Sequence, residues 1–307
     1  MKTKRSHLYK IAGLGLACAL LLTGSAWQAS LAQPALERPA RLDGGSNGTL
    51  PAAACPLDVY LLVDLTGSMG GELATLQANS TLIISTIQAA NPNTRFGIGW
   101  FQDYGYDPYG VPDDKPYVRE LDLTFDTLLF TAVLNSLNLG YGGDLPESQV
   151  PALYNTVTGA GDGTWIEAGQ QANFRSEAAK VIVLVTDAPF HLVYGAIPGG
   201  TPATYTEAVA ALHDLPRAQV LGIFSNPDYP DYITDLENVA RDTGSLAPPG
   251  GVDCGGDGET DILEGDPLVC TVSFTGEGLP EAFIALVETV TDCRAYLPLL
   301  NRAPSLP

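Results

Sequence analysis

A short acidic and hydroxyl-bearing motif directly follows an apolar run near the start of the chain. The run is Val59–Val63, and the motif places Asp64, Thr66 and Ser68 at alternate positions. An unbroken apolar run of this length predicts a strand that is buried on both faces. Alternate spacing in an extended loop points both hydroxyls to the same side. A carboxylate and two hydroxyls are oxygen ligands of the kind that hard divalent cations bind.

Further carboxylates should reach the same place from other parts of the chain. The segment Lys180–Asp187 (KVIVLVTD) is the clearest buried strand, and it ends in Asp187 as the first strand ends in Asp64. Ligands of an open parallel sheet bind beyond the carboxyl ends of its strands, so neighbouring strands would bring these two carboxylates into one crevice. The loop GGDLPES adds Asp144 and Glu147.

A divalent cation would relieve the repulsion among these acids. Carboxylates that converge without lysine or arginine partners raise one another's pKa values. Oxygen-only ligands suit Mg²⁺, Mn²⁺ or Ca²⁺ better than zinc or copper. The alternative is that the same residues are only turn residues and helix caps, because Asp, Thr and Ser favour those positions.

The elements that must position these residues alternate between strand-like and helix-like segments. We expect strands at 59–63, 95–101, 117–123, 180–187 and 218–225. We expect helices at 73–90, 125–137, 204–215, 231–244 and 279–292. Such alternation predicts a single α/β domain, doubly wound, whose mostly parallel central sheet has helices on both faces.

The first 32 residues have the three-part pattern of a secretory signal peptide. A basic start precedes the apolar run Ile11–Leu22, and a cleavage site follows at Ala32. The run is shorter than the about 20 apolar residues of a spanning helix, and nothing after Ala32 is long and apolar enough to cross a membrane. We therefore expect an exported chain, secreted or at the cell surface, with the parts 33–54 (flexible leader), 55–293 (folded domain) and 294–307 (tail).

The chain is strongly acidic, with 15 Lys and Arg against 35 Asp and Glu and a formal net charge of −20. The predicted signal peptide has basic residues and no acids, so its removal makes the rest more acidic still. Such a surface repels nucleic acid and anionic lipid and concentrates cations. We therefore expect no nucleic-acid partner.

The cysteines predict two disulfides. Cys18 lies in the signal peptide, and the even number that remains in an exported chain suggests pairing. Of the possible pairings we favour Cys55–Cys293 and Cys254–Cys270, and the absence of a CxxC motif argues against a zinc site. The second bond would close Pro248–Cys270, an acidic, glycine-rich segment. We expect this segment to be a solvated loop beyond the core, with a Ca²⁺ loop as the less favoured alternative.

Taken together, the motifs resemble those of a known family. Asp64–Ser68 (DLTGS) has the Asp-x-Ser/Thr-x-Ser form of the metal-ion-dependent adhesion site of von Willebrand factor A domains, and it is most similar to the I-like domain of integrin β subunits. The segments FGIGWFQDY, GGDLPES and VLVTDAPFH resemble later motifs of that family and occur in the family's order. The resemblance covers roughly Leu57 to Asp292.

The resemblance implies roles for individual residues. An adhesion-type Mg²⁺ site would be formed by Asp64, Thr66, Ser68, Glu147 and Asp187. A second, Ca²⁺-type site would be formed by Asp103, Asp144, the carbonyl of Pro146 and Glu147, which would bridge both ions. Two departures stand out. Gly142 replaces an amide ligand of the second site, and Gly71-Glu72 replaces paired acids, so a third ion at Glu72 would lack charge.

These roles predict a metal-dependent adhesion module rather than an enzyme. Mg²⁺ usually keeps waters, and one such position could take an Asp or Glu carboxylate of a partner protein. One alternative is a structural assembly module whose metal is structural. Another is a hydrolase, either metal-dependent or with a Ser68–His191–Asp triad, but TGSMG lacks the Gly-x-Ser-x-Gly pattern of a nucleophile elbow. We expect His191 to be a loop residue beside the metal site.

Overall fold

The computed structural model describes residues 55–290. The predicted signal peptide (1–32), leader (33–54) and tail (294–307) lie outside the described residues. The same holds for Cys293, so the Cys55–Cys293 bond stays a prediction.

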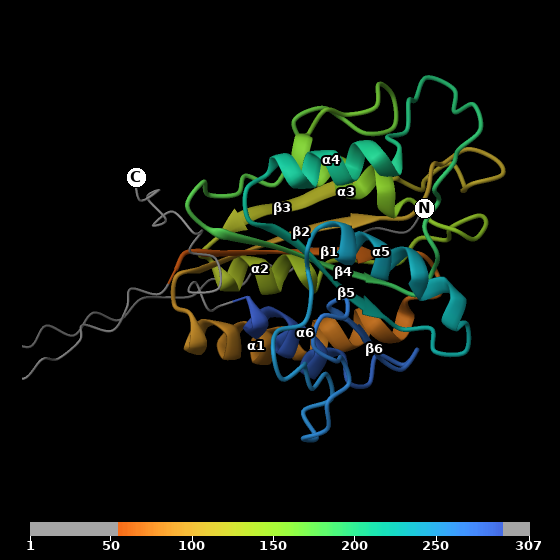
Figure 1. Ribbon diagram of the computed structural model, residues 1–307. Coiled ribbons are helices and arrows are strands. Elements are labelled where there is room, and N and C mark those ends of the chain that lie inside the picture. Colours follow the sequence, from red (N-terminus) through yellow and green to blue (C-terminus); the bar gives the residue numbers. More distant parts are fainter. Residues whose placement is uncertain (1–54, 291–307) are drawn as a thin grey trace, which may run out of the picture. The chain divides into compact units, whose positions relative to one another are not determined.

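One sheet of six strands forms the centre of the described part (Figure 1). The strands are β1 (Leu57–Asp64), β2 (Thr94–Phe101), β3 (Val118–Thr124), β4 (Ala179–Thr186), β5 (Ala218–Phe224) and β6 (Val269–Thr271). Their order across the sheet is β3-β2-β1-β4-β5-β6, and every neighbouring pair is parallel except β2 and β3. The predicted mostly parallel α/β architecture is confirmed.

Helices cover both faces of this sheet. They are α1 (Gly70–Ala90), α2 (Thr127–Leu134), α3 (Gln149–Thr158), α4 (Tyr205–Asp214), α5 (Thr234–Asp242) and α6 (Leu279–Thr289), with a 3₁₀ helix at Pro230–Ile233. One core lies between the sheet and α1, α2 and α6, and the other lies between the sheet and α3, α4 and α5. In Figure 1, α3 and α4 lie above the sheet and α1, α2 and α6 lie below it.

Strand β1 lies between β2 and β4 and is buried along its whole length. Val59, Leu61 and Val63 pack into the core beneath α1, whereas Tyr60 and Leu62 pack into the core beneath α3. Each fully buried side chain of this size contributes about 1.5–3 kcal/mol to folding. The continuous apolar run is therefore the consequence of helices on both faces.

The register of the central strands sets the position of the functional edge. β1 and β4 pair in parallel from Leu57↔Ala179 to Val63↔Val185. The two strands therefore end at the same edge of the sheet, where Asp64 is the last residue of β1 and Asp187 directly follows β4. The condition under which the two carboxylates would share one crevice, that these strands are neighbours, is therefore met.

The segment 248–270 differs from its prediction as an excursion beyond the core. Its apolar residues Val252, Ile262 and Leu268 are buried in the core beneath α1 and α6, and its last residues contribute to β6. The acidic stretches 255–261 and 263–266 are exposed throughout, as are residues 249–250. The predicted disulfide Cys254–Cys270 is present. This segment thus closes the end of the sheet, because its apolar side chains are spaced to reach the core between glycine turns.

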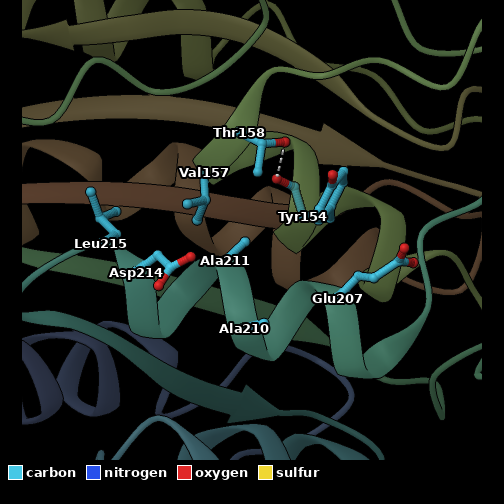
Figure 2. A pocket seen from close by; sticks show the side chains of 8 residues that line it. All are labelled: Tyr154, Val157, Thr158, Glu207, Ala210, Ala211, Asp214 and Leu215. Atoms are coloured by element: carbon cyan, nitrogen blue, oxygen red, sulfur yellow. Dashed lines mark hydrogen bonds between the residues drawn. The ribbon is translucent and has the colours of Figure 1, made fainter.

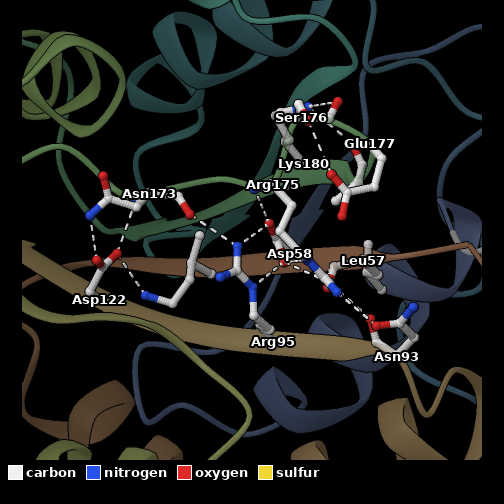
Figure 3. Close-up of polar contacts among 12 residues, drawn as sticks. Leu57, Asp58, Asn93, Arg95, Asp122, Asn173, Arg175, Ser176, Glu177 and Lys180 are labelled. Carbon is white, nitrogen blue, oxygen red and sulfur yellow. Dashed lines mark hydrogen bonds and ion pairs between the residues drawn. The ribbon is translucent and has the colours of Figure 1, made fainter.

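A buried ion-pair cluster lies at the opposite end of β1 from Asp64 (Figure 3). The Asp58 carboxylate accepts hydrogen bonds from Arg95 Nε at 2.9 Å and Nη2 at 2.7 Å. It also accepts bonds from Arg175, through the backbone N–H at 2.7 Å and Nε at 2.9 Å. Among the described residues, no Lys or Arg forms such a pair at the Asp64 edge. Basic partners are therefore concentrated at one end of the sheet and carboxylates without them at the other.

Candidate metal centre

Asp64 is the last residue of β1 and is fully buried. Its Oδ1 accepts hydrogen bonds from the Thr66 backbone N–H at 2.9 Å and from Thr66 Oγ1 at 2.8 Å. Its Oδ2 accepts a bond from Thr186 Oγ1 at 2.8 Å. Burial, reinforced by the charge of Asp187, raises the pKa of Asp64 to about 7. The carboxylate is thus held firmly in place while its negative charge remains costly.

The exposed Ser68 links the loop after β1 to the end of β4. Its Oγ donates to Asp187 Oδ1 at 3.1 Å and lies 3.3 Å from Thr66 Oγ1. Burial raises the pKa of Asp187, and the bond from Ser68 opposes this effect. The oxygens of Asp64, Thr66, Ser68 and Asp187 therefore form one continuous chain at the sheet edge, and Ser68 marks its solvent side.

Glu147 reaches this edge from the loop before α3. Its backbone N–H donates to the Pro189 carbonyl at 3.1 Å, and its carbonyl accepts from the His191 N–H at 2.7 Å. These two bonds pair the loop with the segment that follows β4. Pro146, directly before Glu147, is half-buried. The GGDLPES loop is thereby fixed against the strand end that carries Asp187.

The Glu147 carboxylate is the least satisfied group of the site. The residue is only 3% exposed, and its Oε2 has no hydrogen-bond partner among the described residues. Burial raises its pKa to about 11, and the neighbouring carboxylates that add to this effect are Asp64, Asp103, Asp144 and Asp187. A buried carboxylate close to other acids fits a divalent cation, which would offset part of their combined negative charge.

The predicted second site is built differently from its expectation. Asp103 is buried after β2, and its Oδ1 accepts bonds from the Tyr104 N–H at 2.5 Å and from the Tyr194 hydroxyl at 3.0 Å. Its Oδ2 lies 3.1 Å from His191 Nδ1. Burial raises the pKa of Asp103 to about 6, against the lowering effect of His191. Asp144 is exposed and joins Asp103 and His191 in a group whose ligand atoms all lie within 4.8 Å of one another.

His191 is the member of this group that the sequence did not assign as a ligand. It lies in the loop after β4, four residues beyond Asp187, and no spacing rule marks such a loop histidine as a ligand. Only its closeness to Asp187 in the sequence indicated that His191 lies near the crevice. That closeness did not indicate that its imidazole could bind a metal. The pairing of Glu147 with this loop is what brings the imidazole to Asp103.

Gly142 adds no side chain to the second site and has little room for one. It has a φ of 71°, a left-handed conformation that favours glycine. A Cβ at this position would lie 3.0 Å from Glu147 Oε1 and 3.1 Å from Thr66 Cγ2. The amide ligand that the resemblance would place here is therefore missing.

Glu72, the residue that the resemblance would place at a third site, is buried within the protein. It is 1% exposed, and within the described part both of its carboxylate oxygens, like Ser225 Oγ, lack hydrogen-bond partners. Burial raises the pKa of Glu72 to about 7, and the charge of Asp187 adds to the effect. The preceding Gly71 packs against the backbone of Phe274 and Thr275, so the loop before α6 occupies the space that a side chain at residue 71 would need.

The oxygen and nitrogen atoms of a possible catalytic triad have other partners. The Ser68 hydroxyl bonds to Asp187 and Thr66, whereas His191 Nδ1 bonds to Asp103.

A surface groove between α3 and α4 is separate from the acidic site (Figure 2). Its lining residues, none of which belongs to the site, are Tyr154, Val157, Thr158, Glu207, Ala210, Ala211, Asp214 and Leu215.

The sheet order and the Asp-x-Thr-x-Ser loop at its carboxyl edge define a von Willebrand factor A type of domain. Residues 52–206 match the family profile described as the integrin beta chain VWA domain. The chain belongs to this family. The resemblance noted from the sequence motifs is thereby confirmed.

Curated relatives are integrin β chains of much greater length. Integrin beta pat-3 of Caenorhabditis elegans is 26% identical over 150 residues, which cover 44% of this chain and 17% of that protein. Integrin beta-1-A of Xenopus laevis is 24% identical over 161 residues, which cover 47% of this chain and 19% of that protein. The matched part therefore spans less than a fifth of either relative.

Two solved structures match the chain at low identity. Proximal thread matrix protein 1 from the mussel byssus has a TM-score of 0.45 and 14% identity, over 76% of this chain and 49% of that one. The pilus adhesin SpaC from Lactobacillus rhamnosus GG, in its open conformation, has a TM-score of 0.45 and 12% identity, over 77% of this chain and 30% of that one.

Proposed function

We propose that this protein is an exported adhesion module that binds Mg²⁺ at the edge of its sheet and, through it, a carboxylate of a partner protein. The metal ligands are Asp64, Thr66, Ser68, Glu147 and Asp187. The observation that carries the proposal is the buried Glu147 Oε2, which has no hydrogen-bond partner among the described residues and faces other carboxylates. Membership of the integrin β-chain family supports the same conclusion.

Some ligands of the proposed site are buried and would hold the ion, whereas others are exposed and would leave it open to solvent. Asp64 and Glu147 are buried and supply charge from beneath, while the hydroxyls of Thr66 and Ser68 add oxygens without adding charge. Ser68 is exposed and Asp187 half-exposed, so the site opens to solvent on their side. A bound Mg²⁺ would supply an electrophilic position that takes an acidic group. This is binding chemistry, and we propose no catalytic role.

Export is part of the proposal. The Cys254–Cys270 bond is compatible with an oxidising compartment outside the cell. Within residues 55–290, no helix has the length and apolar character that crossing a membrane requires.

The metal site is tested by calorimetric titration of Mg²⁺, Mn²⁺ and Ca²⁺ into metal-stripped protein. We expect saturable Mg²⁺ binding in the native chain and its loss in Asp64→Asn, which keeps the size of the side chain and removes its charge. Asp214→Asn, an exposed acid at the end of α4, is the matched control and should bind as the native chain does. Equal binding by Asp64→Asn and the native chain would leave only the fold in common with the family, and a structural assembly module would then be favoured.

The acidic-ligand step is tested with immobilised short peptides that carry a single Asp in a glycine and serine background. We expect some of these peptides to retain the protein in Mg²⁺ buffer and to release it when EDTA is added. The matching peptides with Asn in place of Asp should not retain it, because an amide is neutral and a poorer ligand for Mg²⁺. Retention that survives EDTA, or that Asp and Asn peptides share, would contradict the proposal.

A further inference from the structure

We propose that Asp103, Asp144, His191 and Glu147 form a second metal centre that selects a first-row transition ion such as Zn²⁺ over Ca²⁺. This centre was expected from the sequence to be an all-oxygen Ca²⁺ site. The structure places an imidazole in it, and the chemistry of the site changes with that nitrogen.

Ligand atoms from three segments lie close enough together to bind one ion. Asp103 Oδ2 and His191 Nδ1 are 3.1 Å apart, and all three ligand atoms of Asp103, Asp144 and His191 lie within 4.8 Å of one another. A tetrahedral ion with bonds of about 2.1 Å separates each pair of its ligand atoms by about 3.4 Å. Asp144 is exposed in its loop, so a small movement of its side chain closes the remaining difference.

A buried carboxylate without a partner points to a ligand at this cluster. Glu147 is 3% exposed, and its Oε2 is unbonded among the described residues. The charges of Asp103 and Asp144 are among those that raise its pKa, so it lies near the cluster as well as near Asp64. Its backbone carbonyl accepts a hydrogen bond from the His191 N–H at 2.7 Å. This bond holds the backbone of Glu147 beside that of His191, so the carboxylate and the imidazole start from adjacent positions.

The donor set distinguishes between kinds of ion. Ca²⁺ takes six to eight oxygen ligands, and this cluster offers a nitrogen and lacks the oxygen that an amide at Gly142 would supply. Imidazole suits zinc and other transition ions, and zinc accepts mixed sets of His nitrogen and carboxylate oxygen. One nitrogen with two or three carboxylates is therefore a better match for Zn²⁺ than for Ca²⁺.

The surroundings hold the proposed ligands in place before an ion arrives. The His191 ring stacks on Tyr194, with ring centres 4.0 Å apart and an interplanar angle of 19°. Tyr109 contacts the same imidazole edge-on at 4.9 Å. Tyr194 also donates its hydroxyl hydrogen to Asp103 Oδ1 at 3.0 Å. Such bonds and contacts orient metal ligands, and their loss typically lowers metal affinity 10–100-fold.

The test is a calorimetric titration of ZnCl₂ and CaCl₂ into the metal-stripped full chain and its variants. We expect the native chain to bind Zn²⁺ more tightly than Ca²⁺, with a Zn²⁺ affinity at least tenfold weaker in His191→Gln. His213→Gln, which changes an exposed histidine on α4, is the matched control and should leave Zn²⁺ binding unchanged. Asp144→Asn should weaken Zn²⁺ binding as well, and because Asp144 is exposed its loss should not disturb folding.

Two results would overturn the proposal. One is a His191→Gln variant that binds Zn²⁺ as the native chain does, which would leave the Asp103–His191 contact as a plain hydrogen bond. The other is a native chain that binds Ca²⁺ more tightly than Zn²⁺. Asp64→Asn separates this proposal from the proposed function, because it should lose the Mg²⁺ site and keep the Zn²⁺ site.

Discussion

At the scale of single residues, the site consists of carboxylates that the fold buries without basic partners. Asp64 and Glu147 both have raised pKa values, for which burial is the main cause. Asp58, equally buried on the same strand, has two arginine partners, which lower its pKa against the effect of burial. The charged form of an aspartate is thus stabilised at the Asp58 end of β1 and destabilised at the Asp64 end.

The cost of Glu147 can be measured directly. In metal-free protein at pH 8, we expect Glu147→Gln to be more stable than the native chain by about 2 kcal/mol. With a pKa of about 11 the buried Glu147 must bind a proton on folding, and a neutral amide of nearly the same shape avoids that cost. For a domain of this size that is about 5 °C in Tm. The same variant should lose the Tm increase that Mg²⁺ gives the native chain.

Glu259→Gln, at an exposed position of the acidic loop, is the control for this measurement. It should leave both the metal-free Tm and the Mg²⁺ effect unchanged. If metal-free Glu147→Gln has a lower Tm than the metal-free native chain, the carboxylate has a stabilising partner in the protein and does not require an ion.

The residues of the site differ in how far the sequence could predict them. Asp64 and Asp187 follow buried strands, and the rule that ligands bind at the carboxyl ends of parallel strands is enough to bring them together. His191 could not be assigned, because its contact with Asp103 depends on how the loop after β4 pairs with Glu147. Sequence spacing carries no information on that pairing.

At the scale of elements, the contact between α1 and the loop before α6 depends on a glycine. A Cβ at Gly71 would lie 2.7 Å from the backbone of Phe274 and Thr275, whereas one at Gly70 would meet only Leu139 Cδ1 at 3.6 Å. Both glycines are in the first turn of α1. The helix therefore begins where it does with the loop packed directly on its backbone.

This difference predicts opposite effects of two neighbouring substitutions. Gly71→Ala should destabilise the protein by about 1–3 kcal/mol, because the loop backbone must move to admit a methyl group. Gly70→Ala should be neutral or stabilising by up to about 1 kcal/mol, since alanine favours helix and the space is open. Urea unfolding of both variants measures the difference, and equal effects would show that the loop gives way freely.

Helices and strands could be predicted where buried apolar residues recur over a long segment. They were harder to predict where the segment is short or has few apolar residues. The apolar positions Leu73, Leu76 and Ile87 indicated α1, and all are buried. Strand β6 is only three residues long, too short for a period to be visible. The segment 248–270 has few apolar residues among many acids and glycines, so its composition concealed that Val252 and Ile262 belong to the core.

At the scale of the whole molecule, the two ends of the sheet should respond separately to mutation. Asp58→Asn removes the charge that pairs with Arg95 and Arg175, and breaking a buried pair of this kind costs about 3–5 kcal/mol. Because the cluster is at the far end of β1, we expect Mg²⁺ affinity to stay unchanged. Calorimetry at a temperature where the variant is folded checks this, and a parallel loss of metal binding would mean that the ends are coupled.

The acidic edge should also set how stability depends on pH and metal. Asp64 has a pKa of about 7 in the folded protein against an ordinary value of 3.8, so the folded state binds more protons than the unfolded state between these values. Stability of the metal-free protein must then fall as pH rises through this window. From pH 5 to pH 8 we expect a loss of about 2 kcal/mol from Asp64 alone, and Glu147 adds to it in the same direction.

Mg²⁺ should reverse this trend, because it binds the ionised carboxylates and so stabilises the folded state more as pH rises. Tm should therefore fall between pH 5 and pH 8 in EDTA and fall much less, or rise, with saturating Mg²⁺. The paired Asp58 does not confuse the result, since its lowered pKa confines its contribution to pH values below this window. Asp64→Asn should make the EDTA curve less steep, with the contribution of Glu147 remaining, and should remove the difference between the two conditions. A native chain whose Tm in EDTA is highest at pH 8 would contradict the view that unpaired carboxylates limit its stability.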